Sequence, residues 1–445
     1  MNVIVFVCDT FRYDHMGCNG NDWIRTPCID KLAAESVVFD NAQTGSFATL
    51  PNRMDCFNGR YNFLYRGWTA LSPEQTLAET LTEAGYTTQL ICDTPHMINN
   101  GRNFGRGFQG WRMIRGQEVD PFMTAANVIV EDACPDHIVN RWGKVPQYYR
   151  NSLLRKTETD WASPRTMMAA TEWLEMNYKA KDFFLWVDCF DPHEPWDPPE
   201  WFTRHYYPDY KGIEYVYPKA GKASVYSKSE LKWFRARYAG KVTLVDKWIG
   251  FALRKLEDLG LDKTTMILLT SDHGTYLGDH NRIVKACGGK EMWSLLNEVG
   301  HIPLMVRPPA GVKQKRVSKL VQPFDLMPTV LDMCGVKAPA GVQGKSYAHM
   351  LEGSRKSIHK YAVSSGGMYD EDHINKRMPT ITGNGFALCL ASTGKHELYD
   401  MKKDPLQTRN VFKKHPEIAR KMFKWLEDMF AGEGLDPGRI AVLKP

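Results

Sequence analysis

The chain has 445 residues, enough for one large domain plus a smaller one or for two to three ordinary domains. Its 43% of hydrophobic and 24% of charged residues are typical of a folded globular protein. The net charge of +6 is modest, and basic residues do not cluster with aromatic ones, so we expect no nucleic-acid partner. No apolar run is long enough for a membrane span, and the first residues lack a signal-peptide pattern. With no Cys-x-x-Cys pair among the ten cysteines, these features predict a cytoplasmic protein with reduced thiols and no membrane partner.

Strand-like apolar runs alternate with helical patterns along the first 350 residues. The helical pattern at 72–85, for example, has Ser72 as its cap, Pro73 in its first turn and Gly85 at its end. The first predicted elements in chain order are a strand over 3–9, a helix over 26–36, a strand over 37–42, the helix over 72–85 and a strand over 87–92. They are followed by a strand over 182–190, a helix over 230–260, strands over 264–272 and 302–308, and a helix over 325–335.

Two stretches in the middle, about 98–165 and 197–228, are rich in Trp, Tyr, Arg and Pro and show little periodicity. We predict long loops there that form the walls of a pocket. After about residue 355 the pattern changes to short strands and a last helix, at 360–365, 386–392, 396–400 and 416–430.

This order of elements predicts an α/β fold, because alternating strands and helices form a mostly parallel sheet with helices on both faces. We predict a large mixed, mostly parallel sheet sandwiched by helices over 1–355. A small C-terminal α+β subdomain, with short antiparallel strands and a terminal helix, is predicted over 356–445.

Acidic residues and histidines follow the predicted strands where each strand ends. Ligands of an open parallel sheet bind beyond these carboxyl ends. One Asp there is usually a helix cap or a turn former, but several at one sheet edge indicate a metal site. We therefore interpret Asp9, Asp272 and His273 as ligands of a divalent cation. The residues that follow the strands are Asp9, Asp93, Asp191, His193, Asp272 and His273.

Two further stretches of the sequence carry candidate functional residues. Lys285 follows Asp272 within about a dozen residues; such a lysine is normally just solvated, but beside a metal it can hold an anionic oxygen. The stretch SFATLPNR, from Ser46 to Arg53, puts a threonine and a proline before a predicted helix. Taken alone, that pattern indicates a helix N-cap at Thr49.

Over nearly its whole length, the sequence resembles the sulfatase family of the alkaline phosphatase superfamily. The order and spacing of the matching stretches carry the resemblance more than any one of them. These stretches are NVIVFVCDTFRYDHMG, TPCIDKLAAESVVFDNA, TLPNRMDCFNGRY, FDPHEP, RYAGKVTLVDKWIGFALRKLEDLG with TSDHGTYLGDH, PFDLMPTVLDMCGV and HELYDMKKDPLQTRNV.

The resemblance implies roles for individual residues. Thr49 takes the nucleophile position, where it would also be a metal ligand, and Arg53 would hold its oxygen and the oxygens of the substrate. His193 corresponds to the histidine that serves the leaving group, although a His in DPHEPW could also only brace the loop. His280 and His301 are candidate substrate-binding residues, and His301 could equally be a packed core histidine.

The sequence departs from the family pattern in three places. Threonine stands where sulfatases have the Cys or Ser that becomes formylglycine. Asp9-Thr10 replaces the usual Asp-Asp, which removes one anionic ligand. The family's Gly-Lys-x-His reads CDTPH, so Asp93 and His96 are candidates for substrate binding or for a second metal.

We therefore expect a metal-dependent hydrolase of phosphate-type esters, with a phosphodiester or phosphonate monoester favoured, acting through a covalent Thr49 intermediate. The partner is a small anionic ester, the cation is Ca, Mn, Mg or Zn, and a homo-oligomer is possible. A sulfatase without formylglycine is the first alternative, and a non-catalytic binding protein of the same fold is the second. Phosphoryl transfer through the same threonine is a further alternative.

Overall fold

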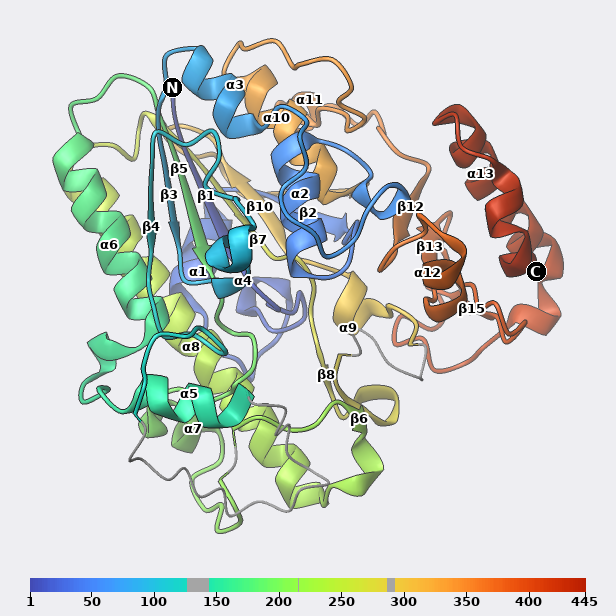
Figure 1. Ribbon diagram of the computed structural model, residues 1–445, viewed down its shortest axis with the longest axis horizontal. Helices are drawn as coiled ribbons and strands as arrows, with labels where there is room; N and C mark the ends of the chain where they lie inside the picture. The colour runs from blue at the N-terminus through green and yellow to red at the C-terminus, as the bar shows by residue number, and fades with distance from the viewer. Residues whose placement is uncertain (126–143, 215, 286–292) are drawn as a thin grey trace.

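The centre of the molecule is a sheet in which β1 (Asn2–Cys8) lies between β5 (Phe183–Cys189) and β7 (Thr265–Thr270), parallel to both. The computed structural model describes residues 1–125, 144–214, 216–285 and 293–445 (Figure 1). In the described part of the chain the strand order of this sheet is β11-β2-β10-β7-β1-β5-β3-β4.

The sheet is mixed but mostly parallel. Only β10 (Leu304–Arg307), among the described strands of this sheet, runs antiparallel to its neighbours, β7 on one side and β2 (Val37–Ala42) on the other. The outer strands are β11 (Lys315–Val321) beside β2, and β3 (Thr87–Cys92) followed by β4 (Gly110–Met113) beside β5. The carboxyl ends of β1, β3, β5 and β7 consequently lie along one edge.

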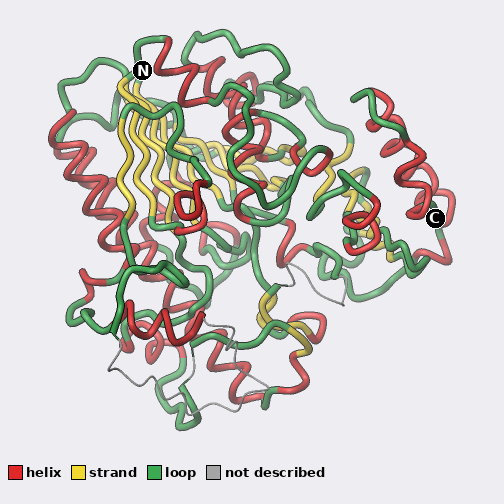
Figure 2. The backbone as a smooth tube through the Cα atoms, viewed as in Figure 1, coloured by secondary structure: helices red, strands yellow, loops and turns green. Residues whose placement is uncertain are grey.

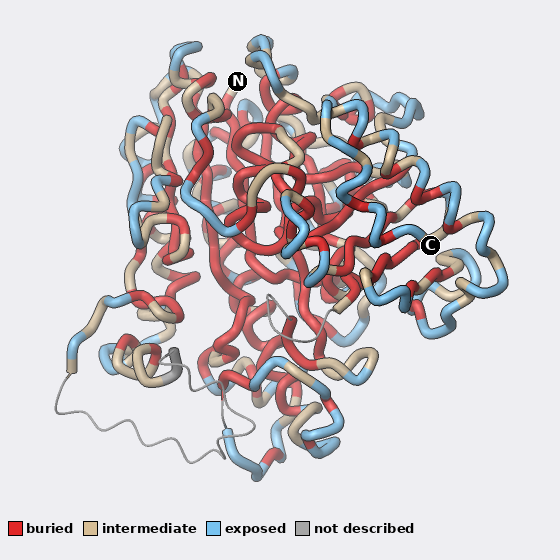
Figure 3. The backbone as a smooth tube through the Cα atoms, turned by 45° about the vertical axis from the view of Figure 1, so that its right-hand side comes forward, coloured by how far each residue is buried: buried red, intermediate tan, exposed pale blue. Residues whose placement is uncertain are grey.

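Helices cover both faces of this sheet, as Figure 2 shows. Alternate residues of β1 point to opposite faces, so Ile4 and Phe6 belong to one core and Val3 and Val5 to the other. The first core is closed by α1 (Pro27–Ala34), α6 (Ala162–Asn177) and α8 (Lys228–Asp258). The second is closed by α2 (Thr49–Asn58), α3 (Leu77–Glu83), α10 (Leu326–Met333) and α11 (Ala348–Leu351). The central strands β1, β5, β7 and β10 are buried along their length, and the burial of the sheet between its two layers can be followed in Figure 3.

A second, antiparallel sheet follows in the C-terminal part, with the order β12-β13-β14-β15. The helix α13 (Pro416–Gly432) packs on it through Phe423 and Leu426. Phe63 and Phe324, from outside this sheet, belong to the same apolar core. The strands are β12 (Tyr361–Ser364), β13 (Thr380–Gly383), β14 (Phe386–Cys389) and β15 (Glu397–Asp400).

The remaining elements are short. A small antiparallel sheet of order β6-β9-β8 is formed by β6 (Gly221–Lys222), β9 (Arg282–Val284) and β8 (Tyr276–Leu277). The other helices are α4 (Pro95–Ile98), α5 (Lys144–Ser152), α7 (Glu200–Tyr206), α9 (Asn297–Gly300) and α12 (Glu371–Lys376). Among the described residues, no helix combines the length and the apolar character needed to cross a bilayer.

The predicted fold class is confirmed, and two details of the prediction are wrong. Ser72 does not cap α3: its hydroxyl accepts a hydrogen bond from Asn58, and the cap is Thr76, which forms a capping box with Glu79. The predicted loop regions contain β4, α5 and α7 and the start of α6. The periodicity of α6 is weak because it packs between the sheet and α8 and buries residues around most of its circumference. The predicted boundary at residue 355 falls just before β12, and the division into two domains stays a prediction.

Candidate active site

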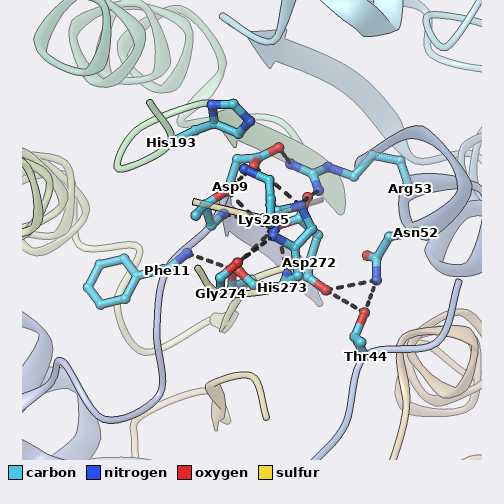
Figure 4. A network of polar contacts seen from close by, with 12 residues as sticks. Asp9, Phe11, Thr44, Asn52, Arg53, His193, Asp272, His273, Gly274 and Lys285 are labelled. Carbon is cyan, nitrogen blue, oxygen red and sulfur yellow. Dashed lines mark hydrogen bonds and ion pairs between the residues drawn. The ribbon is translucent and has the colours of Figure 1, made fainter. Parts of the chain in front are cut away.

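Three predicted ligands meet where β1 and β7 end. Asp9 follows β1, and Asp272 and His273 follow β7, and one ligand atom from each lies within 4.8 Å of the others. All three residues are fully buried. Figure 4 shows their side chains directed toward one another. The parallel register of the two strands brings together residues that are more than 260 positions apart in the sequence.

The chemistry of these three residues fits a cation. His273 Nε2 is buried without a hydrogen bond among the described residues, and it lies 3.4 Å from Asp272 Oδ2, whose charged partner is Arg53. His273 Nδ1 lies 2.9 Å from the carbonyl of Gly274, so it carries the proton and leaves the lone pair on Nε2. Burial lowers the pKa of His273 to about 4, which keeps the ring neutral. Two carboxylates and a neutral imidazole suit several divalent metals.

Arg53 is the cationic centre of the same cluster. Its fully buried guanidinium donates from Nε to Asp188 Oδ2 at 2.8 Å and from Nη2 to Asp188 Oδ1 at 3.0 Å. Nη2 also lies 3.2 Å from Asp9, and Nη1 lies 2.6 Å from Asp272 Oδ2. Arg53 therefore links both candidate metal-ligand carboxylates to a third acid.

Sequence reasoning missed Asp188, which holds Arg53 in place. Asp188 lies on β5, and its carboxylate also accepts hydrogen bonds from Thr94 and Trp186. The signal was present, because Asp188 is the one charged residue within an otherwise apolar strand run.

Thr10 stands where the family pattern has a second acid, and it hydrogen-bonds to both remaining carboxylates. Its hydroxyl donates to Asp9 Oδ1 at 2.8 Å, and its backbone N–H donates to Asp272 Oδ1 at 3.0 Å. Burial and the proximity of Asp272 raise the pKa of Asp9. A cation beside the two carboxylates would oppose this shift, because positive charge favours their ionised forms.

Thr49 is the first residue of α2, and it is 2% exposed. The capping interpretation does not apply: the N-cap is Ala48, and no side chain caps this helix. Among the described residues the Thr49 hydroxyl has no hydrogen-bond partner. Thr49 lies on the same helix face as Asn52 and Arg53, which are three and four residues further along.

Residues before and after Thr49 in the sequence contact the segment that carries Asp272 and His273. Thr44 donates to the carbonyl of Asp272 at 2.6 Å, and Asn52 donates to the same carbonyl at 3.2 Å. The ring of Phe47 lies 4.9 Å from that of His273, centroid to centroid. These contacts fix the beginning of α2 against the loop that carries Asp272 and His273.

Lys285 and His193 are joined through Glu194, which sequence reasoning also missed. Lys285 Nζ lies 3.0 Å from both carboxylate oxygens of Glu194. Burial alone would raise the pKa of Glu194, but its contacts with His193 and Lys285 outweigh this effect and lower the pKa to about 2. The signal was again present, since Glu194 directly follows His193 in the matching stretch.

His193 stacks on Phe190, with 4.1 Å between the ring centroids, and its Nδ1 lies 2.5 Å from the carbonyl of Glu194. Burial lowers the pKa of His193 to about 3, so the ring is neutral and its Nε2 is unprotonated near pH 7. As an acid for a leaving group, the ring would first have to gain a proton, which a bound anion would favour.

The loop that carries His193 is held by a buried ion pair. Lys241, on α8, lies 2.5 Å from Asp191, which also accepts hydrogen bonds from Gln117 and Ser163. Burial alone would raise the pKa of Asp191, but Lys241 lowers it. Asp191 therefore anchors the loop.

Asp93 and His96 lie beside this anchor rather than beside Asp9. Asp93 accepts a hydrogen bond from the backbone of Phe190, and burial together with Asp191 raises its pKa. His96 Nε2 lies 2.9 Å from Glu118. Among the described residues, neither belongs to the group of side chains that could hold a metal.

His280 and His301 are also outside that group. His280 lies 3.2 Å from Glu298. His301 stacks on Tyr13 with 3.8 Å between ring centroids, and its Nε2 lies 2.9 Å from the carbonyl of Asp40. Their predicted substrate-binding roles stay predictions.

Comparison with known proteins identifies relatives along the whole chain. The family profile described as Sulfatase matches residues 1–336, and the profile described as N-sulphoglucosamine sulphohydrolase, C-terminal, matches residues 292–431. An arylsulfatase of Clostridium perfringens is 26% identical, over 92% of this chain and 90% of its own length. An N-acetylglucosamine-6-O-sulfatase of Bacteroides thetaiotaomicron is 27% identical, over 94% of this chain and 84% of its own length.

Solved structures share the fold. A phosphonate monoester hydrolase of Agrobacterium radiobacter superposes with a TM-score of 0.75 at 19% identity, covering 97% of this chain and 95% of its own. A protein solved in complex with its substrate D-glucosamine-2-N,6-O-disulfate also has a TM-score of 0.75, at 22% identity, covering 97% of each chain.

Proposed function

We propose that this chain, which belongs to the sulfatase family, hydrolyses a monoanionic phosphate-type ester, a phosphodiester or a phosphonate monoester, with Thr49 as its nucleophile. That it is an ester hydrolase follows from the family itself. The observation that carries the finer proposal is Thr49 itself: the residue is 2% exposed, its hydroxyl forms no hydrogen bond among the described residues, and it lies one helical turn before Arg53.

A threonine at this position favours phosphorus over sulfur. It cannot become formylglycine by the route open to Cys or Ser, so a covalent ester on Thr49 must be released by water attacking the central atom. That attack proceeds more readily at phosphorus than at sulfur. The beginning of α2 supports the first step, because its backbone N–H groups and dipole stabilise an anion there.

The charges around the site favour a substrate that carries one negative charge. The described residues supply four carboxylates (Asp9, Asp188, Asp272 and Glu194) and two cationic side chains, Arg53 and Lys285. With one divalent cation the site is electrically neutral. A phosphate monoester dianion would make it doubly negative, whereas a diester or a phosphonate monoester adds a single charge.

Sulfatase-family enzymes use a divalent metal, and Asp9, Asp272 and His273 are the residues that would hold it. When bound, such a cation supplies Lewis-acid chemistry and lowers the pKa of a nearby hydroxyl. Arg53 would hold the carboxylates in place and contact the oxygens of the substrate. Lys285 would contact the same oxygens from the opposite side, and His193 would give a proton to the leaving oxygen.

Substrate preference is tested with nitrophenyl esters of sulfate, phosphate, a phosphodiester and a phenylphosphonate, assayed with Ca, Mn, Mg and Zn in turn. We expect the phosphodiester or the phosphonate to give the highest kcat/KM. A sulfate ester that is cleaved fastest would contradict the phosphorus assignment and establish the sulfatase alternative, which the names of the two curated relatives favour. No turnover with any ester and metal would favour the non-catalytic alternative.

The nucleophile is tested by Thr49→Val, which keeps the shape of the side chain and removes the hydroxyl. We expect kcat to fall by at least about 10³-fold and Thr49→Ser to retain part of the rate. Rapid quenching should trap a phosphorus adduct on the peptide Ser46–Arg53.

The matched control is Thr265→Val. Thr265 is equally buried and also lacks a hydrogen-bond partner for its hydroxyl among the described residues, but it begins β7 at the end opposite to Asp272. Normal turnover by Thr49→Val, with no trapped adduct, would refute the covalent mechanism and move the chemistry to a water molecule.

A cytoplasmic location and a homo-oligomeric state stay predictions. All eight cysteines in the described part of the chain are free, and this supports the expected reducing compartment.

A further inference from the structure

A cavity of about 880 Å³ opens where the edge of the large sheet meets the C-terminal sheet. We call it the edge cavity. One wall comes from β2 and β11, which contribute Asn41 and Lys319, and the other comes from the C-terminal sheet, which contributes Phe386. Its volume lies in the upper part of the range of small-molecule sites, so it has room for a ligand much larger than a phosphate ion.

The edge cavity lies at the end of the C-terminal sheet that is farther from the candidate active site. At the near end, Ser365 directly follows β12 and forms a β-bridge with Ser46, three residues before Thr49. The far end is separated from it by the length of β12, roughly 10 Å at about 3.4 Å per residue. None of the described lining residues belongs to the catalytic cluster. The residues that mark the far end, in register across the four strands, are Tyr361, Gly383, Phe386 and Asp400.

The edge cavity is positively charged. Lys319, Lys360 and Lys402 line it, and its described lining residues include no carboxylate. None of the three ammonium groups forms an ion pair or a hydrogen bond among the described residues; that of Lys360 lies over the ring of Tyr361, at 5.7 Å from the centroid. The carboxylate of Asp400, just outside the lining, accepts the backbone N–H of Lys402. This surplus of positive charge in a concave site favours an anion.

Two histidines also line the edge cavity, and they leave its charge unchanged. Burial lowers the pKa of His301 to about 4, so its ring is neutral near pH 7. His359 Nε2 lies 2.8 Å from Asp325 Oδ2, so a charge on this ring is balanced by the carboxylate. The acid nearest to His301 in the sheet, Asp40, is paired with Arg316. The three lysines therefore set the charge that a ligand meets.

The three lysines stand on different elements. Lys360 directly precedes β12 and Lys402 follows β15, and three strand spacings of about 4.8 Å, roughly 14 Å in all, separate these two strands. Lys319 lies on β11 where the register with β2 shifts, and such a bulge redirects the side chains of an edge strand. An anion that contacts all three lysines is therefore longer than a single phosphate group.

We propose that the edge cavity binds a nucleoside triphosphate, as a ligand distinct from the substrate. The three lysines contact the phosphate chain as point charges. The ring of Phe386, half-buried in the lining, stacks on the base. The side-chain amide of Gln43 and the hydroxyl of Ser318, which form no hydrogen bond among the described residues, suit the polar edges of the base and the hydroxyls of the ribose. This inference goes beyond the proposed function and does not depend on it.

The mixed lining is the reason for choosing a nucleotide. The lysines require a ligand with several negative charges, but Leu320, Ile358, Phe386 and Met401 give the same cavity an apolar surface. A purely inorganic polyphosphate would leave this surface in contact with water, whereas a base covers it and gains the free energy of apolar burial. An apolar ligand without phosphates would leave the ammonium groups without partners.

The test measures binding rather than turnover. ATP, tripolyphosphate and adenosine are titrated by calorimetry, in excess magnesium, into the full-length Thr49→Val protein, in which the proposed nucleophile is absent. We expect ATP to bind more tightly than either of its parts. The variant Lys319→Gln/Lys360→Gln/Lys402→Gln, made in the same background, should lose about tenfold or more in affinity for ATP. Phe386→Leu should lose about fivefold for ATP and less than about twofold for tripolyphosphate.

The matched control is Lys413→Gln/Lys414→Gln/Lys421→Gln, which removes the same charge from exposed lysines of the C-terminal part that do not line the edge cavity. It should change the affinity for ATP by less than about twofold. Asp272→Ala should also keep the affinity for ATP, because the candidate active site takes no part in this binding. Equal losses in the two triple variants, loss of ATP binding in Asp272→Ala, tripolyphosphate bound as tightly as ATP, or no binding of ATP would each overturn the inference.

Discussion

The buried pair of Arg53 and Asp188 allows a quantitative prediction for Asp188→Asn. Asp188 Oδ2 accepts from Arg53 Nε at 2.8 Å and from Trp186 at 3.0 Å, and Oδ1 accepts from Arg53 Nη2 at 3.0 Å and from Thr94 at 2.6 Å. An asparagine amide has one oxygen. In either orientation its NH₂ therefore points at one N–H of Arg53, and the guanidinium loses a charged partner.

Removing one partner of a buried ion pair costs about 3–5 kcal/mol. The unfolding entropy of a chain of 445 residues is roughly 0.9 kcal/mol per kelvin, from about 2.1 cal/mol/K per residue. We therefore expect Asp188→Asn to lower the Tm by about 3–5 °C. A displaced Arg53 should also lower kcat/KM by about 100-fold, since errors near 1 Å at a catalytic group have that effect.

Differential scanning calorimetry at one fixed scan rate measures the shift, and the nitrophenyl ester assay measures the loss of activity. The control is Asp372→Asn, which removes an exposed i,i+4 pair with Lys376 and should change the Tm by less than about 1 °C. A Tm within 1 °C of the parent, together with unchanged kcat/KM, would refute the assignment of Asp188 as the residue that holds Arg53.

Three further predictions concern the metal, the leaving group and the effect of pH. Asp272→Ala should abolish activity and tight metal binding, and retention of the full metal content, measured by plasma mass spectrometry, would show that the ligand set is wrong. His193→Ala should reduce kcat for poor leaving groups roughly 10²–10⁴-fold more than for nitrophenyl esters; equal losses would assign His193 to binding instead. Burial of its ring lowers the pKa of His301 to about 4, from about 6.5 in the unfolded chain. Between pH 6.5 and pH 4 the unfolded state therefore binds a proton that the folded state does not. The free energy of unfolding should consequently fall as the pH decreases through this range. His301→Gln should flatten this part of the pH profile of the denaturant midpoint, and an unchanged profile would mean that other groups cause the dependence.

Much of the large sheet was predictable because its strands are continuous apolar runs. The strands predicted at 37–42 and 87–92 match β2 and β3 to the residue. β11 was missed because it is an edge strand with four polar or charged residues in KRVSKLV, so its sequence lacks the pattern of a buried strand. Its partner in the sheet, β2, supplies the hydrogen bonds that define it.

The sequence predicts those site residues that lie just after the end of a buried strand. Asp9 directly follows β1 and Asp272 lies two residues beyond β7, so the parallel register of these strands brings the two acids together. Asp188 and Glu194 were not predicted because their roles depend on partners, Arg53 and Lys285, that reach them only through tertiary packing. The local sequence marks Asp188 as a charged residue inside an apolar run, but it does not identify Arg53, 135 positions away, as its partner.

The central position of β1 has a consequence for biosynthesis. β1 is made before both of its hydrogen-bonding neighbours, β5, which begins at Phe183, and β7, which begins at Thr265. At about 5–20 residues per second, the ribosome needs roughly 10–35 s to make β5 after β1, and several seconds more to make β7. During that interval an apolar strand leaves the exit tunnel with no partner inside the sheet. An unpaired apolar strand is prone to aggregation during that interval, and the speed of translation limits when the site can form.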